Sequence, residues 1–591
     1  MVAKKTTKTP GQTFFRTYWA DFCVLGLFII VACIYWFPLP FYLRTAEIEW
    51  PVVDPAFNQW IIAWGNHALL HFPWHFFDAN MFYPYHNTLA WGDHLFSLTI
   101  FAIPLIPFIG VIGAYNVLLL ASSALSGFFT YLLAKYVLKN RPAAVVAGLL
   151  WSLSYYRATE YGHIQSLSTQ WIPLVFLFAE KIRLELNRKN VIWFIIVTFL
   201  MLSTNVYLAL FTVMAFTLYW LLTIAARQIK LRNILWLGFG WIMAGLLAIP
   251  LYLPSIILQL KNPLIRGYDG QASLALNGLL PWPYPGHIIR KLLLLWGYPT
   301  ADSGYPQTAT GTFHTLGLIS YPLLLIAIIL LIKEWRKWKQ HWFYIVLLIV
   351  ALVSFAAAAG PVVHWSEYVL TVNNWFYKIP YHIIPGYKAL RIPMRWFFLG
   401  SLAIAVVAGW AWSRVFKNIP TLWHAFLIGT LVVWLIIEQA PAPVPIHAMY
   451  QIQDYPVYQW LRAQPDDFAI LEVPIYPGVA IHGNDIIEAK RMYLSTFHWK
   501  KRVSGAITPY IPDSYIENAK LLNRLGEDQG AIDLLRSWNV KYVIFLPDDY
   551  ADLGWDASRR DLVKQNLDNT SGLKKEVEFK NATVYKVVPY E

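Results

Sequence analysis

"EIEWPVVDPAFNQWIIAWGNHALLHF", residues 47–72, follows directly on the first long apolar run of the chain and carries three carboxylates, Glu47, Glu49 and Asp54. After Pro55, apolar residues recur at helical spacing: Phe57, Trp60, Ile61, Trp64 and Ala68. This pattern predicts a helix with Asp54 as its N-cap and Pro55 at its first position. Its tryptophans predict that the helix lies on a membrane surface, where aromatic rings settle between headgroups and acyl chains.

Asp54 has two interpretations. As a helix cap it would only accept hydrogen bonds from backbone N–H groups, and the helix dipole would favour its ionised form. As a general base it would need enough burial to offset that effect on its pKa. The spacing alone leaves both roles open.

The composition is that of an integral membrane protein. Of 591 residues, 57% are hydrophobic and only 14% are charged, and the mean hydropathy is +0.44. Such a chain is too apolar for a soluble protein of this length. The net charge of +13 does not indicate nucleic acid, because most Lys and Arg lie in short loops between apolar runs, where they orient membrane spans.

Runs long enough to cross a membrane predict about eleven helices. They lie at 22–42, 114–137, 143–157, 168–183, 190–205, 207–225, 234–257, 314–332, 342–360, 395–415 and 421–440. A further run, 95–110, is short and contains Pro104 and Pro107. If it does not cross, five basic loops fall on the side of the basic N-terminus, at 135–141, 181–189, 227–232, 333–339 and 413–417. We therefore predict a re-entrant or interfacial hairpin at 95–110, with the N-terminus inside and the C-terminus outside.

The polarity of the chain changes near residue 441, after the proline-rich segment "EQAPAPVPIH". Beyond it, "FAILEVPI", "VKYVIFL" and "ATVYKVV" read as strands, and "DYPVYQWLRAQ" and "DSYIENAKLLNRLGEDQGAIDLLRSW" as helices. We predict a polytopic α-helical membrane domain over 1–440, whose first outer loop (43–113) holds interfacial helices, and a soluble extracytoplasmic α/β domain over 441–591. The proline-rich outer loop 258–313 is a candidate lid.

The first loop also carries His67, His71 and His75 at four-residue spacing. On an unbroken helix these would share one face, as metal ligands do. Pro73 is expected to end that helix before His75, so packing or hydrogen bonding is the favoured interpretation. A divalent cation such as Mg²⁺ or Mn²⁺, held by carboxylates and a substrate phosphate, stays open.

Charged residues cluster again where two later spans meet the outer side. "YYRATEYGHIQSLSTQW" carries Arg157, Glu160, His163 and Gln165, and "IIPGYKALRIPMRWFFL" carries Lys388, Arg391 and Arg395. The alternative for Arg391 and Arg395 is that their side chains only snorkel to the interface near a helix end. Because cations are less expected on the outer side, we favour phosphate binding.

These segments, in their order, resemble the bacterial multi-spanning glycosyltransferases of the GT-C superfamily that carry a C-terminal periplasmic α/β domain. The resemblance rests on "VDPAFNQWIIAWGNHAL", "NMFYPYHNTLAWGDHLF", "YYRATEYGHIQSLSTQWIPL", "YKALRIPMRWFFL", "DYPVYQWLRAQ", "HWKKRVSGAITPYIP" and "AIDLLRSWNVKYVIF". It implies a bacterial inner-membrane enzyme with an outward-facing site that moves a sugar from a polyprenyl-phosphate donor to a glycan, lipid or protein acceptor, with inversion.

By this resemblance Asp54 would be the general base, and Lys388, Arg391 and Arg395 would bind the donor phosphate. Site-shaping roles would fall to Glu49, Asp93, His94, Arg157, Glu160, His163 and Gln165. The chain departs from the family pattern in two places: its first-loop acids Glu49 and Asp54 are five residues apart instead of two acids one residue apart, and Glu160 stands where relatives often carry histidine. Two other functional classes stay open, a transporter or flippase for lipid-linked saccharides and a non-catalytic membrane scaffold.

Overall fold

The computed structural model describes residues 10–48, 53–265, 273–279, 311–312, 316–365, 368–441, 443–475, 484–505, 508, 510–552 and 556–589. The chain divides into two compact units. Unit 1 comprises Met1–Phe41, Val117–Ala248 and Ile265–Val444, and unit 2 comprises Tyr42–Asn116, Ile249–Leu264 and Pro445–Glu591. The first loop is thus grouped with the C-terminal residues. A division at residue 440 into membrane and extracytoplasmic domains stays a prediction.

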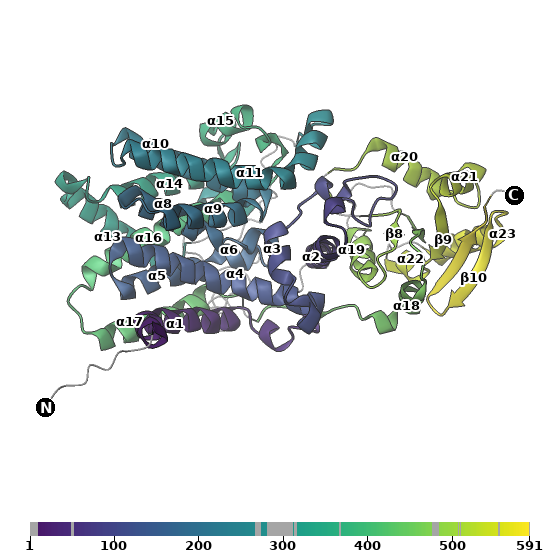
Figure 1. Cartoon of the computed structure of the whole chain (residues 1–591), viewed down its shortest axis with the longest axis horizontal. Coiled ribbons are helices and arrows are strands. Elements are labelled where there is room, and N and C mark those ends of the chain that lie inside the picture. Colours follow the sequence, from purple (N-terminus) through teal and green to yellow (C-terminus); the bar gives the residue numbers. More distant parts are fainter. Residues whose placement is uncertain are drawn as a thin grey trace. The chain divides into compact units, whose positions relative to one another are not determined.

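All eleven apolar runs form helices (Figure 1). These are α1 (Pro10–Tyr35), α4 (Ile106–Leu138), α5 (Arg141–Ser152), α8 (Trp171–Leu184), α9 (Arg188–Leu202), α10 (Val206–Ala225), α11 (Leu231–Lys261), α13 (Ser320–Lys333), α14 (Trp342–Ala358), α16 (Phe397–Val415) and α17 (Thr421–Gln439). Within the described residues, six are long and apolar enough to cross a membrane, namely α1, α4, α10, α11, α16 and α17, with α13 and α14 shorter apolar helices. Eleven crossings stay a prediction.

The run 95–110 is divided between two helices. α3 (Phe96–Ala102) is followed by a turn, and α4 then begins at Ile106 with a kink at Gly110, whose φ is 72°. Seven residues of helix rise only about 10 Å, a third of a hydrocarbon core of about 30 Å. This length favours the predicted hairpin over a crossing.

In unit 1, α16 is the central helix. In the span that contains α16, 94% of the apolar segment is buried inside the protein, whereas in α17 the buried share is 17%. α5 and α14 pack against it (Figure 1). By contrast, α17 leaves large apolar side chains exposed, among them Leu422, Trp423, Phe426 and Val433. A helix that is apolar all round and buried belongs to a core, whereas the exposed side of α17 suits contact with lipid.

α1, α4 and α5 approach closely at two glycines. A Cβ on Gly148 would lie 2.4 Å from the Phe28 ring and 2.6 Å from the Gly127 carbonyl oxygen. Small residues of this kind let the backbones of membrane helices pack closely.

Gly148→Ala is therefore expected to lower the free energy of unfolding by about 1–3 kcal/mol, because backbone must move to admit the methyl group. Thermal unfolding of the purified full-length protein checks this. Gly26→Ala on α1 is the matched control, since a Cβ there meets nothing within 4 Å. Equal midpoints for both variants would contradict the close packing.

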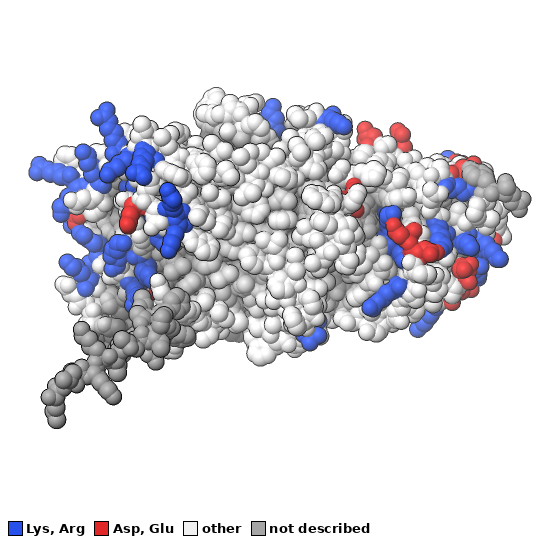
Figure 2. All heavy atoms as spheres, in the orientation of Figure 1, with Lys and Arg blue, Asp and Glu red and all other residues white. Residues whose placement is uncertain are grey.

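Basic residues gather at one end of unit 1 (Figure 2). They include last-turn residues of several helices: Lys135, Lys181, Arg183, Lys333 and Arg414. On the face shown, a broad belt of the unit beyond them displays few charged side chains (Figure 2). This separation agrees with a helical bundle whose basic loops share one side of a membrane.

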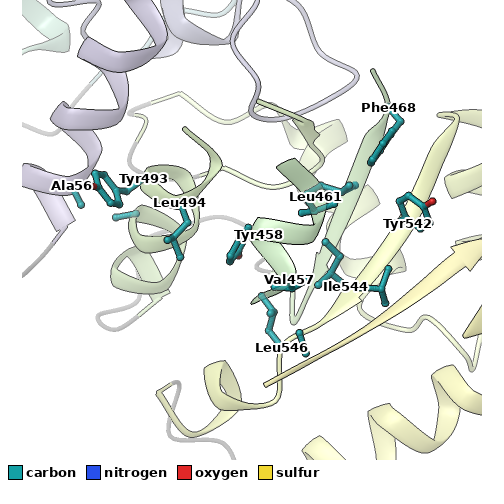
Figure 3. Close-up of a cluster of buried hydrophobic side chains, with 14 of the residues drawn as sticks. Ala56, Val457, Tyr458, Leu461, Phe468, Tyr493, Leu494, Tyr542, Ile544 and Leu546 are labelled. Carbon is teal, nitrogen blue, oxygen red and sulfur yellow. The ribbon is translucent and has the colours of Figure 1, made fainter. Parts of the chain in front are cut away.

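In unit 2, α2 (Val53–His71) is the helix predicted in the first loop. It begins at Val53, so Asp54 lies inside the first turn and not at the N-cap, and Pro55 is accommodated because first-turn N–H groups have no intrahelical partner. Every residue from 55 to 66 is buried, in contrast to the surface helix we expected. One reason is that α2 packs against α19 (Asn484–Ser495), where Ala56 lies beside Tyr493 (Figure 3).

The C-terminal residues form a five-stranded sheet in the order β10-β11-β9-β7-β8. β7 (Ala469–Val473) runs parallel to β8 (Lys501–Arg502) and β9 (Val540–Phe545), while β11 (Ala582–Val587) pairs antiparallel with β9 and β10 (Leu573–Phe579). All three predicted strands are present. The long predicted helical stretch is divided into α20 (Asp513–Leu522) and α21 (Gln529–Ser537), with Gly526 at φ 90° between them. The remaining helices of this part are α18 (Pro456–Ala463), α22 (Asp548–Asp552) and α23 (Ala557–Asn569).

The first loop is hydrogen bonded to these C-terminal residues. β1 (Ala46–Ile48) pairs with β6 (Ile446–Ala448), and the Tyr83 N–H donates to the Arg502 carbonyl at 2.9 Å. One buried hydrophobic cluster extends from Tyr542 and Ile544 of the sheet, past Val457 and Leu461 of α18 and through α19, to Ala56 of α2 (Figure 3). The first loop is thus an integral part of unit 2.

Candidate functional site

In unit 1, Glu160 and Arg395 form a buried ion pair. Glu160 directly follows α6 (Tyr155–Thr159), and its Oε2 accepts a hydrogen bond from Arg395 Nε at 3.2 Å and lies 3.0 Å from Arg395 Nη2. Both side chains are at most 5% exposed, and His163 Nδ1 lies 3.6 Å from the same carboxylate oxygen. Glu160 therefore neutralises Arg395, which leaves Arg395 less suited to hold a phosphate by itself than the sequence implied.

Arg157 and Gln165 are both buried near this pair in the sequence. Arg157 donates to the Leu167 carbonyl at 3.0 Å and to Thr169 Oγ1 at 2.9 Å, and its guanidinium lies 5.7 Å from the Trp151 ring centre. These bonds fix the turn that carries α7 (Ile164–Leu167). Within unit 1, Arg157 supports the segment that holds Glu160 and His163.

Lys388 and Arg391 are the accessible cations of the later loop. Arg391 is exposed and Lys388 is half-buried, with its Nζ 5.7 Å from the Tyr381 ring centre. Among the described residues, neither has a carboxylate partner. Tyr207 at the start of α10 joins this segment to the ion pair: its hydroxyl accepts from the Arg391 N–H at 2.9 Å, and its ring lies 4.8 Å from the Arg395 guanidinium.

The same loop carries an exposed apolar surface. α15 (Trp375–Ile383) presents Trp375, Phe376, Ile379 and Ile383, each at least 49% exposed. It follows the hairpin of β4 (Val363–Trp365) and β5 (Tyr368–Thr371). An amphipathic helix of this kind suits the boundary between lipid headgroups and acyl chains.

In unit 2, Asp54 and Glu47 have opposite environments. Asp54 stays partly exposed in the first turn of α2. Glu47, in β1, is only 1% exposed and accepts a hydrogen bond from Gln59 Nε2 of α2. Burial raises the pKa of the Glu47 carboxyl to about 8, although the Gln59 bond lowers it. Glu47 was not among the predicted site residues, and only its position beside Glu49 marked it in the sequence. Glu49 lies outside the described residues.

His94 is buried, and its Nδ1 accepts from the Phe96 N–H at 3.1 Å at the start of α3. Burial lowers the pKa of His94 to about 4, so the ring is neutral at physiological pH. Its ring packs against Tyr252 of α11, 5.3 Å between centres, and the half-buried Asp93 lies within electrostatic reach of the same tyrosine. Asp93 and His94 thus join the first loop to Tyr252 within unit 2.

The histidine series does not share one helix face. α2 ends at His71, and Pro73 begins a short 3₁₀ helix that contains His75, as the proline predicted. His67 stacks on Trp499 with ring centres 4.3 Å apart, and burial followed by the nearby His71 lowers its pKa to about 4. Among the described residues, no three His, Cys, Asp or Glu side chains gather as metal ligands.

The sequence did not single out Tyr207 or the contact between Glu47 and Gln59. Tyr207 follows Asn205, the N-cap of α10, in a segment that resembles any helix start. Glu47 and Gln59 belong to different elements, so their contact needs the fold. The candidate lid, 258–313, lies largely outside the described residues.

No protein-family model and no curated protein matches the sequence. In structure, the chain is similar to the arabinofuranosyltransferase AftD from mycobacteria, with a TM-score of 0.57 and 14% identity, over 97% of this chain and 40% of AftD. It also matches ArnT from Cupriavidus metallidurans bound to undecaprenyl phosphate, at a TM-score of 0.45 and 11% identity, over 95% and 97% of the two chains. A third match is the oligosaccharyltransferase AglB from Archaeoglobus fulgidus, in complex with an inhibitory peptide and a dolichol-phosphate, at 0.44 and 13%, over 93% and 72%.

The chain spans about two fifths of the length of AftD. The likeness to AftD, at a TM-score above 0.5 over most of this chain, shows a shared fold.

Proposed function

We propose that the protein is a membrane glycosyltransferase that moves a sugar from a polyprenyl-phosphate donor to an acceptor hydroxyl. The GT-C fold supports this proposal, because AftD, which shares it, is a glycosyltransferase. The observation that carries it is the environment of Asp54: every residue of α2 from 55 to 66 is buried, yet Asp54, in the first turn, is only half-buried.

In the proposed reaction, Asp54 takes the proton of the acceptor hydroxyl while the oxygen of that hydroxyl forms a bond to the anomeric carbon of the donor sugar. The bond from that carbon to the donor phosphate oxygen breaks on the opposite side of the sugar, which inverts the anomeric centre. The polyprenyl phosphate leaves with the electron pair. Glu49 and the Asp93–His94 pair are proposed to shape the acceptor side of this reaction.

The leaving phosphate needs positive charge. We assign this task first to Arg391 and Lys388, because they are accessible and have no carboxylate partner among the described residues. Arg395, paired with Glu160, is proposed to contribute its remaining nitrogen and to hold Tyr207. Arg157, His163 and Gln165 support this segment. The exposed apolar side of α15 suits a donor whose isoprenoid chain stays in lipid.

Replacing Arg391 or Lys388 with glutamine is expected to lower kcat/KM for the donor about tenfold each, equivalent to roughly 1.4 kcal/mol of lost transition-state stabilisation. Initial rates against donor concentration in proteoliposomes measure this. Lys378→Gln is the matched control, since Lys378 lies in the same loop but bonds to Asn373. Unchanged donor kinetics in both variants would move the phosphate site elsewhere.

We further propose a bacterial inner-membrane location, with the N-terminus inside and Asp54, α15 and the C-terminal sheet outside. The acceptor is a glycan, a lipid or a protein. Chelation tests the role of a divalent cation: donor turnover by the purified protein in lipid is followed before and after chelator, and on adding back Mg²⁺ or Mn²⁺. A loss that either ion restores would assign a metal to the reaction, and an unchanged rate would leave Asp54 and the cations to act alone.

A further inference from the structure

Glu47 lies in a buried group of polar atoms in unit 2 with too many hydrogen-bond acceptors. Its Oε2 accepts from Gln59 Nε2, but Glu47 Oε1 and Gln59 Oε1 have no partner among the described residues, and both are shielded from water. The side chains of Glu47 and Gln59 are 1% and 0% exposed. Leaving such buried acceptors without a donor costs free energy.

In the part of the chain that the structure describes, no cation pairs with Glu47 to offset its charge if it is ionised. Its cross-strand partner in β6 is His447, and none of the described lysine, arginine or histidine side chains forms an ion pair with it. Among the described residues, Glu47 acts electrostatically on three tyrosines, Tyr115, Tyr450 and Tyr493. The Asp54 carboxylate acts on Tyr115 as well. An ionised Glu47 would thus add a second negative charge near Asp54.

A proton on Glu47 would supply the missing hydrogen-bond donor and remove the uncompensated negative charge. A carboxylic acid at Glu47 provides the donor that Gln59 Oε1 lacks, while its other oxygen keeps the bond from Gln59 Nε2. Rotating the Gln59 amide by 180° would bring an amide oxygen against the carboxyl oxygen, and that contact again requires a proton. The hydrogen-bond count therefore favours a neutral acid paired with an amide.

We propose that Glu47 is a protonated positioning residue: as a neutral acid it joins β1 to α2 through Gln59 and holds the start of the helix that carries Asp54. Asn116 fixes the same strand, because its Nδ2 donates to the Ala46 carbonyl at 2.7 Å and the Leu43 carbonyl at 2.9 Å. The part of this inference that concerns Asp54 rests on the proposed function.

Infrared spectroscopy of the full-length protein in lipid tests the protonation without reference to activity. At pH 7 the native protein should show the carbonyl stretch of a protonated carboxylic acid, which Glu47→Gln removes and Asp78→Asn leaves in place. Asp78 is a first-loop carboxylate whose pKa is lowered despite its partial burial, by hydrogen bonds from Asn87 and His75, so it is ionised at that pH. With a pKa of about 8, the protonated fraction of Glu47 falls about tenfold between pH 7 and pH 9. A band at pH 7 that survives Glu47→Gln would overturn the proposal.

Stability and activity give two more readouts. Between the ordinary value of 4.5 and about 8, the folded chain holds one proton more than the unfolded chain, so the native unfolding midpoint should fall as pH rises in this window. Glu47→Gln can make both hydrogen bonds with Gln59, so its unfolding midpoint should no longer fall as pH rises in this window. Glu47→Ala cannot make these bonds, so it should not show the stability of Glu47→Gln.

If donor turnover is observed, native activity should decline above about pH 8 and Glu47→Gln should retain it. Identical pH profiles in an active native protein and Glu47→Gln would overturn the positioning role. A protein without turnover would count against the proposed function, while the infrared band and the unfolding midpoints would still decide whether Glu47 is the neutral acid that holds α2.

Discussion

Replacing Arg502 with methionine is expected to lower the free energy of unfolding by roughly 3–5 kcal/mol, because it leaves the buried Glu472 without its ion-pair partner and Glu488 with Arg491 alone. Arg502 is fully buried in β8, with its Nε 2.5 Å from Glu472 and its Nη2 2.8 Å from Glu488. Glu488 also pairs with the buried Arg491 at 2.7 Å. Without Arg502, the buried carboxylates keep the free-energy cost of their desolvation but lose the attraction that offset it.

The neighbouring residue provides the control for this prediction. Lys501 forms an ion pair with Asp467 at 2.8 Å, but both side chains are at least 46% exposed. Lys501→Met should change stability by no more than about 1 kcal/mol. Unfolding of the full-length protein followed by tryptophan fluorescence compares the two, and a similar small effect in both would show that the buried network does not stabilise unit 2. Because Tyr83 bonds to the Arg502 backbone, loosening of the first loop should accompany the loss.

The second large effect is on catalysis. Asp54→Asn is expected to reduce sugar transfer by about 10²–10⁴-fold, since an amide cannot accept the acceptor proton while the helix keeps its shape. The unfolding midpoint should stay near that of the native protein, because Asp54 is partly exposed and asparagine is tolerated in a first helical turn. Donor affinity should also be unchanged, since phosphate binding is assigned to other residues.

Asp78→Asn is the control for the general loss of a first-loop carboxylate. Asp78 accepts from the Asn87 N–H at 2.9 Å and from His75, and has no proposed catalytic role. Turnover that survives Asp54→Asn at the native rate would leave Asp54 as a structural residue of α2. The base would then have to be another carboxylate, with Glu49 and Asp93 the next to test.

Hydrophobic patterning predicted the helices well, because eleven apolar runs have few other ways to satisfy their backbone in lipid. It also predicted the strands β7, β9 and β11. Burial of α2 on every side could not be seen in its sequence: a row of tryptophans at helical spacing reads as interfacial until α19 is known to pack against it.

Charge partners were the least predictable part of the candidate site. Glu160 and Arg395 are 235 positions apart, and only the fold brings them together. Arg395 is thus the ion-pair partner of Glu160, whose role could not be predicted from the sequence. The raised pKa of Glu47 likewise depends on burial that no local pattern records. Residues held by short-range geometry, such as Pro73 at the end of α2, behaved as expected.

A transferase is distinguished from a transporter by measuring the release of free polyprenyl phosphate from a panel of radiolabelled polyprenyl-phosphate sugars by the full-length protein in liposomes. If the protein is a glycosyltransferase, at least one donor should be consumed, with its sugar recovered on water or an added acceptor and its anomeric configuration inverted. If the folded protein consumes none of them but moves lipid-linked saccharides across the bilayer, it is a transporter, and the proposed sugar transfer is wrong.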